Sequence, residues 1–115
     1  MNTVLARHGT TYYFRHRSCE LEGHLVSEGM LVMAGSSARK DPRPGAPETI
    51  IHRRSRLLLD GTAKIEFNRL VLAQNHLFAT PSLAVDLMNG GHVREPLKLW
   101  RDANGGTLQD ILGTE

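Results

Sequence analysis

The sequence is short of cysteine and of long apolar runs, and these shortages limit the classes of protein to which the chain can belong. Cys19 is the only cysteine, so no disulfide can form within the chain. The N-terminus carries polar and charged residues in place of the apolar stretch of a signal peptide. Apolar runs such as residues 57–59 are far shorter than the roughly 20 residues that span a bilayer. These absences exclude a membrane protein and indicate a cytoplasmic one.

Signatures of catalysis and of metal binding are also missing. The histidines are spread almost evenly, no two of them stand four residues apart on a helix, and one cysteine cannot form a zinc pattern. Ser82 lacks the glycine elbow of a nucleophilic serine. We therefore expect no cofactor, no metal site and no enzymatic activity. A small hydrolase, built from carboxylates and histidines that converge in space, stays as a further alternative.

The length and composition fit one domain. The chain has 115 residues, of which 40% are hydrophobic and only 5% aromatic, so its core must be built mainly from aliphatic side chains. We divide it into residues 1–20, an N-terminal arm and first strand; residues 21–112, a single domain; and residues 113–115, a tail. The first strand is expected at residues 11–14.

Two hairpins are indicated by residue alternation. From Cys19 to Leu25, apolar or small residues on odd positions alternate with polar ones, which is the period of a half-buried strand. A turn at 27–29 and an apolar run at 30–34 complete the hairpin. Residues 36–47 hold three prolines and are predicted to form an exposed loop. Alternation over 62–67 and an apolar run at 70–73 predict a second hairpin or a bent strand pair.

The first predicted helix covers residues 48–59. Its apolar face is expected to consist of Ile50, Ile51, Leu57 and Leu58, with Arg54 intruding on that face. Gly61 follows the predicted helix at the position where a left-handed C-cap residue is expected.

The second predicted helix covers residues 81–89 and begins with a hydroxyl N-cap and a proline, Thr80-Pro81. We expect Trp100 to pack under the turn that follows this helix. Thr107 and Asp110 have the spacing of a capping box for a last short helix through Leu112. The expected fold is α+β, a mainly antiparallel sheet of two hairpins covered by two helices plus a short C-terminal helix.

Basic residues concentrate in the first half of the chain. Residues 1–57 carry nine Arg and Lys against five acids, whereas residues 58–115 carry five against seven. Six of them lie on the predicted loop and first helix: Arg39, Lys40, Arg43, Arg53, Arg54 and Arg56. Because arginine presents a planar fork to phosphate, these residues are candidate nucleic-acid contacts. The alternative is that the helical arginines cap the helix C-terminus and solvate its outer face.

The order of these motifs resembles the domain-of-unknown-function family 4357. The resemblance covers roughly residues 21–112. Its motifs are an apolar strand into Gly35-Ser36, an arginine-bearing helix from Arg53 to Gly61, the segment from Phe78 to Ala84 around Thr80-Pro81-Ser82, the turn Gly90-Gly91 leading to Trp100, and Gly106-Thr107-Leu108. Residues 92–99 depart from the Asn-Gly that family members have close to the Trp, so a binding role of that turn would not carry over.

The resemblance implies a DNA-associated role. Modules of this kind are often found at the C-terminus of GIY-YIG nuclease-like proteins and beside restriction-modification components, which implies a nuclease or methylase as partner. Our leading hypothesis is a non-catalytic DNA-binding accessory module. The alternative is a protein-interaction module or small inhibitor that docks on a partner enzyme through apolar residues such as Val93, Leu97 and Leu99.

Overall fold

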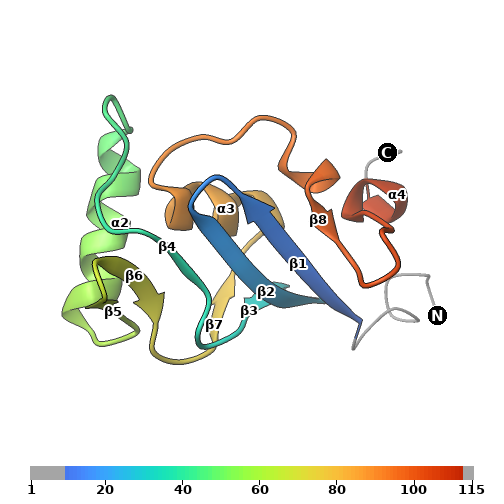
Figure 1. Cartoon of the computed structure of the whole chain (residues 1–115), viewed down its shortest axis with the longest axis horizontal. Coiled ribbons are helices and arrows are strands. Elements are labelled where there is room, and N and C mark those ends of the chain that lie inside the picture. The colour runs from blue at the N-terminus through green and yellow to red at the C-terminus, as the bar shows by residue number, and fades with distance from the viewer. Residues whose placement is uncertain (1–9, 113–115) are drawn as a thin grey trace.

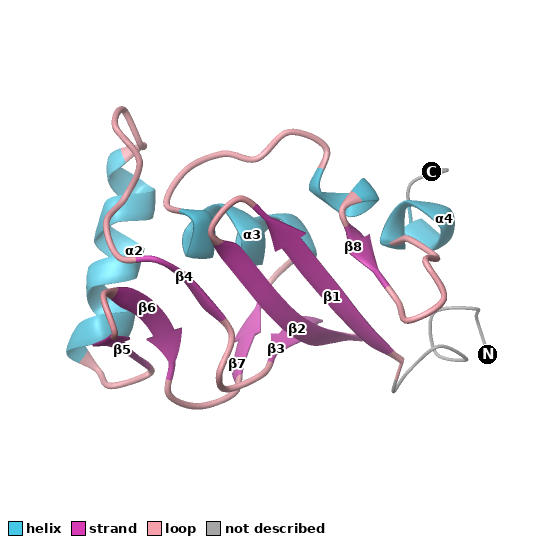
Figure 2. Ribbon diagram, in the orientation of Figure 1, coloured by secondary structure: helices cyan, strands magenta, loops and turns pink. Residues whose placement is uncertain are grey.

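The computed structural model describes residues 10–112 as an antiparallel sheet with helices packed against it (Figure 1). In chain order the elements are β1 (Thr11–His16), β2 (Cys19–Val26), β3 (Gly29–Val32), β4 (Ser37–Arg39), α2 (Glu48–Leu59), β5 (Ala63–Glu66), β6 (Arg69–Leu72), β7 (His76–Phe78), α3 (Pro81–Asn89), the 3-10 turn η1 (Pro96–Lys98), β8 (Trp100–Arg101) and α4 (Leu108–Leu112). Figure 2 shows α3 behind the central strands and α2 beside the β4–β6 end. The expected α+β fold is confirmed, while the predicted arm before residue 10 and the tail after residue 112 lie outside the described residues.

The sheet forks along β2, its longest strand. On one side β2 pairs with β1, and β1 pairs with β8. On the other side Glu20 pairs with Ser37 of β4, whereas residues 23–26 pair with β3. Strands β6 and β5 extend the first branch, and β7 extends the second. The first strand is therefore an integral part of the same sheet, and all pairs are antiparallel.

Both predicted hairpins are confirmed. In β2 the side chains of Cys19, Leu21 and Leu25 are buried and those of Glu20 and Glu22 are exposed, as the alternation requires. The apolar face of the sheet is thus the one that the helices cover. Strands β5 and β6 form the second hairpin, closed by a two-residue turn.

The predicted loop at 36–47 is wrong at its beginning, because Ser37–Arg39 forms the strand β4. Its partners are Glu20 of β2 and residues 69–71 of β6, both distant in sequence. The proline-rich composition therefore indicates a loop only at residues 40–47. Strand β4 forms because it pairs with residues distant in the sequence, which no local pattern indicates.

Helix α2 has the predicted bounds but buries a narrower face than expected. Ile50 and Leu57 are buried together with Arg54, whereas Ile51 is 42% and Leu58 36% exposed. At 100° per residue the two pairs lie on opposite flanks of Arg54. Because α2 stands at the end of the molecule, only one flank is covered.

Helix α3 confirms its capping prediction. Its N-cap hydroxyl, on Thr80, accepts a hydrogen bond of 3.0 Å from the Leu83 N–H, and Gly90 ends the helix in the left-handed region. Trp100 is fully buried, and its indole N–H donates to the Pro81 carbonyl over 3.3 Å. That hydrogen bond goes to the first residue of α3, not to the turn after the helix.

The C-terminal segment closes the described fold. The Thr107 N–H donates to Asp110 over 3.0 Å and the Asp110 N–H donates to the Thr107 hydroxyl over 3.3 Å, so the capping box is confirmed. Among the helices of residues 10–112, none has the length and apolar character needed to cross a bilayer.

Candidate functional site

The six basic residues singled out from the sequence do not form one surface. Arg39, Lys40 and Arg43 lie on β4 and the loop that follows it, while Arg53 and Arg56 are exposed on α2. Arg54 lies between these groups in the interior.

Arg54 is 3% exposed, and its hydrogen bonds go to main-chain carbonyls. Its Nη1 donates to Leu87 and Met88, each over 2.7 Å, and its Nη2 donates to Arg39 over 2.7 Å and to Lys40 over 3.1 Å. Burial, and then the nearby Arg39, lowers its pKa from the ordinary value. Arg54 therefore acts as an internal brace, and its guanidinium is not available to a nucleic acid.

Arg43 is held in place by the turn that ends α3. Its N–H donates to the Gly90 carbonyl over 2.8 Å, and its Nε donates to the Asn89 side chain over 3.0 Å. Asn89 is itself buried and donates to the Gly91 carbonyl over 2.9 Å. The guanidinium of Arg43 is thus oriented by a rigid, hydrogen-bonded turn.

Arg43 lines a cleft of about 360 Å³ whose other basic residues come from elsewhere in the chain. The lining residues are His16, Arg17, Arg43, Asn89, His92, Val93 and Arg94, and we call this the basic cleft. They belong to three segments: the β1–β2 turn, the loop after β4, and the end of α3 with the loop that follows. In Figure 1 these segments meet along one side of the molecule.

The cations of the basic cleft repel one another. Burial, and then the charges of Arg39 and Arg17, lowers the pKa of Arg43. The ion pairs of residues 10–112 are Lys64–Glu66 and Lys98–Glu95, with His92–Asp86 as a third when the histidine is protonated, so none of them neutralises an arginine. An anion that entered the cleft would relieve this repulsion.

Arg17 reaches the cleft from an unusual backbone conformation. Its φ is +56°, a left-handed value that costs a non-glycine residue about 1–2 kcal/mol. Arg69 on β6 secures this turn by donating hydrogen bonds to the Ser18 carbonyl and to the Ser37 hydroxyl. Backbone strain that the surrounding structure enforces is common at binding sites, where it fixes a side chain.

His92 stands at the rim of the cleft beside a carboxylate. Its Nδ1 lies 3.6 Å from Asp86, whose other oxygen accepts a hydrogen bond of 3.1 Å from the Val93 N–H. Asp86 therefore holds the backbone of the loop and places a carboxylate beside the histidine. The nearby Glu95 is engaged by Lys98 over 2.7 Å, and this contact, before Arg94, holds the pKa of Glu95 below its usual range.

Arg53 and Arg56 line a different, mainly apolar groove of about 280 Å³ between α2, β7 and α3. The other lining residues are Leu57, His76, Leu77, Phe78, Ala79, Leu83 and Leu87. The two helical arginines therefore line a hollow that shares no lining residue with the basic cleft. Of the apolar residues proposed for docking on a partner enzyme, Val93 is buried, and Leu97 and Leu99 are partly buried and pack against the core.

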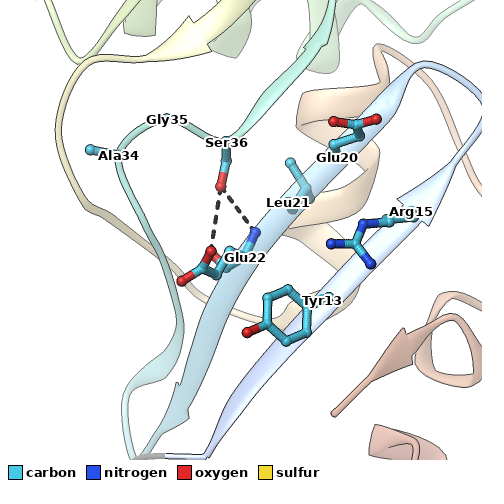
Figure 3. Close-up of a pocket in the computed structure, with 8 residues that line it drawn as sticks. All are labelled: Tyr13, Arg15, Glu20, Leu21, Glu22, Ala34, Gly35 and Ser36. Carbon is cyan, nitrogen blue, oxygen red and sulfur yellow. Dashed lines mark hydrogen bonds between the residues drawn. The ribbon is translucent and has the colours of Figure 1, made fainter. Parts of the chain in front are cut away.

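A third hollow, of about 310 Å³, lies on the open face of the sheet where it forks (Figure 3). There the Ser36 hydroxyl accepts a hydrogen bond of 3.0 Å from the Glu22 N–H and lies 3.5 Å from the Glu22 carbonyl. The Arg15 guanidinium lies 5.3 Å from the centre of the Tyr13 ring. Ser36 thus replaces a missing strand partner, and its hydroxyl is used by the fold.

The sequence lacks the His and Cys spacing that is typical of a metal site. Within residues 10–112, no group of three or more His, Cys, Asp or Glu side chains could hold a metal ion.

Four residues of the basic cleft were not singled out from the sequence as binding residues: Arg17, Arg94, His16 and His92. The departure of residues 92–99 from the family pattern was a signal for His92 and Arg94, and no pattern pointed to His16 or Arg17.

Comparison with known proteins identifies a family. A family model described as Domain of unknown function (DUF4357) matches residues 12–112. No curated protein and no solved structure matches the chain.

Proposed function

The chain belongs to this family of domains of unknown function, and we propose that it is a non-catalytic, nucleic-acid-associated accessory module that holds backbone phosphates in the basic cleft. The observation that carries the proposal is the convergence of Arg17, Arg43 and Arg94 from three segments, with no arginine of residues 10–112 in an ion pair. The resemblance to modules that accompany DNA-modifying enzymes supports the same conclusion.

Phosphate is the anion whose chemistry suits these side chains. A guanidinium offers parallel N–H donors that match two phosphate oxygens, and it stays charged at every physiological pH. Arg39 and the exposed Lys40 lie on the strand and loop that lead to Arg43, so they extend the positive surface beyond the cleft. A nucleic-acid strand bound there would contact several cations in succession.

The cleft is expected to read the backbone and not the bases. Its lining contains no Phe, Tyr or Trp on which a base could stack. Phosphate contacts position a protein without carrying sequence information. We therefore expect similar affinity for DNA of different sequence, with a steep dependence on salt.

The test is fluorescence anisotropy of labelled duplex and single-stranded DNA between about 50 and 200 mM salt. The cleft variants are Arg17→Gln, Arg43→Gln and Arg94→Gln, and the matched control is the Arg53→Gln/Arg56→Gln double variant on α2. Each cleft variant is expected to weaken binding uniformly across sequences and to lower the salt slope by about one. Absence of binding at low salt, or a larger loss in the control than in the cleft variants, would overturn the proposal.

A second candidate function follows from the groove between α2, β7 and α3. This groove combines apolar walls with two arginines, so it suits an apolar protein segment that carries acidic residues. A partner held there would be recovered with the protein after nuclease treatment and lost with Leu77→Asp. Recovery that Leu77→Asp leaves unchanged would remove this candidate.

A further inference from the structure

Strand β5 is a free edge of the sheet. It pairs with β6 on one side, and within residues 10–112 no strand pairs with its other side. An edge strand presents backbone N–H and C=O groups that can pair with another chain.

The hairpin geometry places one residue at the centre of this edge. Phe67 and Asn68 form a two-residue loop with φ of +52° and +64°, the pattern of a type I′ turn. In such a hairpin the flanking residues, Glu66 and Arg69, face each other across hydrogen bonds. Hydrogen bonding alternates along the strand, so Ile65 directs its N–H and C=O toward the free edge.

An exposed apolar patch surrounds this position. Ile65 lies opposite the buried Leu70, which places its side chain on the helix side of the sheet, yet it is 43% exposed. Phe67 at the turn is 93% exposed. Helix α2 contacts both α3 and β5. Its Leu57 flank lines the groove with α3, and Ile51 and Leu58 lie on the opposite, exposed flank. We call Ile51, Leu58, Ile65 and Phe67 the edge patch.

The other face of β5 carries opposite charges at symmetric positions. Lys64 and Glu66 flank Ile65 and form an ion pair of 3.4 Å. If two copies of β5 pair antiparallel about Ile65, each Lys64 lies opposite Glu66 of the other copy. A lysine in an edge strand normally discourages pairing, but in this register it meets a carboxylate.

From this self-complementarity we propose that two copies of the chain form a symmetric dimer by antiparallel pairing of their β5 strands about Ile65. Such an interface is isologous, because the same patch serves both copies. The backbone of Ile65 supplies two hydrogen bonds, Lys64 and Glu66 supply two charge pairs, and the edge patches cover each other. None of these residues lines the basic cleft, so the dimer would leave the basic cleft of each copy accessible.

The first test is sedimentation equilibrium of the whole chain up to a concentration on the order of 1 mM. A dimer is expected, and a chain that stays monomeric throughout this range overturns the proposal. An acidic variant, Lys64→Glu, and a basic variant, Glu66→Lys, each place like charges across the interface. Each alone is expected to dimerise at least tenfold more weakly than wild type.

The equimolar mixture of the acidic and basic variants separates contacts between chains from contacts within one. Each variant also has like charges within its own strand, and mixing cannot repair that. Across the interface, however, mixing restores both charge pairs, so we expect a heterodimer as strong as the wild-type dimer to within threefold. Dimers of wild-type strength in each variant alone, or no gain on mixing, would show that β5 is not the interface.

A further pair of variants guards against misfolding. Phe67→Asn suits the left-handed turn better than phenylalanine does, so the hairpin is retained while apolar contact is lost. We expect the dissociation constant to rise at least tenfold. The matched control is Leu77→Asn on β7, which removes an exposed apolar side chain outside the edge patch and is expected to leave dimerisation unchanged. Equal effects of the two variants would contradict the proposed surface.

Discussion

Arg54 in α2 and Met88 near the end of α3 are joined by a hydrogen bond of 2.7 Å from the guanidinium to the main-chain carbonyl. The negative end of the α3 dipole also stabilises a cation at this place. The same side chain holds the carbonyls of Arg39 and Lys40, at the start of the loop that bears Arg43. One buried arginine therefore links both helices to the loop of the basic cleft.

Replacement of Arg54 is expected to be severely destabilising. Arg54→Met keeps the apolar stem but leaves buried carbonyls without a donor, and Arg54→Lys cannot reproduce the planar fork. We expect a loss of about 1–3 kcal/mol in the free energy of unfolding for each carbonyl that Arg54→Met leaves buried without a donor, measured by urea denaturation. Arg53→Met, at the exposed neighbouring position, is the control and should change stability by no more than about 0.5 kcal/mol. Similar losses at both positions would contradict the brace.

Two glycines with the same backbone conformation are expected to respond differently to alanine. Gly90 has a φ of +77° and Gly45 a φ of +79°, so alanine is strained at both. A Cβ at Gly90 would lie 2.8 Å from the Cα of Pro42, whereas at Gly45 it would meet nothing within 4 Å. Gly90→Ala should therefore cost about 1–3 kcal/mol more than Gly45→Ala.

The same pair tests the position of the loop that bears Arg43. Because Gly90→Ala pushes against residue 42, we expect it to weaken DNA binding, while Gly45→Ala leaves binding unchanged. Anisotropy titrations of the two folded variants provide the measurement. Equal affinities would show that the loop tolerates this displacement.

The thiol of Cys19 is expected to be inert in the folded protein. Burial raises its pKa to about 12, although Arg69 and Arg54 act in the opposite direction. At pH 8 iodoacetamide should therefore label it only as fast as the protein unfolds, with fast labelling in urea as the control. Rapid labelling without denaturant would show an accessible thiolate.

The same group links stability to alkaline pH. Its folded pKa lies above its unfolded value, so its contribution to stability is complete below about pH 8.5 and is lost as the pH rises toward about 12. Urea midpoints of wild type should fall more steeply over this range than those of Cys19→Ala. The comparison isolates the thiol, because every other titrating group is shared. Parallel slopes would contradict the shift.

Ser36 is expected to stabilise the fork of the sheet through its hydroxyl. Ser36→Ala leaves the Glu22 N–H without its 3.0 Å acceptor, which should cost about 1–3 kcal/mol of unfolding free energy. Ser55→Ala, on the exposed face of α2, is the control and should be neutral or slightly stabilising, because alanine is the best helix former. An equal effect at both serines would show that the fork does not need the hydroxyl.

The elements that local chemistry determines were predictable from the sequence. Thr80-Pro81 begins α3, Thr107 and Asp110 cap α4, and the alternation in β2 gives its buried face. Strand β4 was not predictable, because its strand character comes from pairing with residues distant in the sequence. The fork has the same origin, since no local pattern tells that β2 exchanges one partner for another along its length.

The candidate site was predicted only in part. Arg43 was singled out by composition, and the intrusion of Arg54 on an apolar face was visible as a cation between Ile50 and Leu57. What the sequence could not supply is that the turn with Arg17 and the loop with Arg94 would meet Arg43. Convergence of three separate segments is a property of the tertiary fold.

The arrangement of the basic cleft also makes the fold a scaffold for engineering. Each wall is a surface connection that a side chain of a regular element holds: Arg69 holds the β1–β2 turn, Arg54 the loop after β4, and Asn89 the loop after α3. Surface connections tolerate substitution and insertion far better than cores. A library randomised at residues 17, 43, 92 and 94 would thus vary ligand preference while the anchoring side chains stay constant.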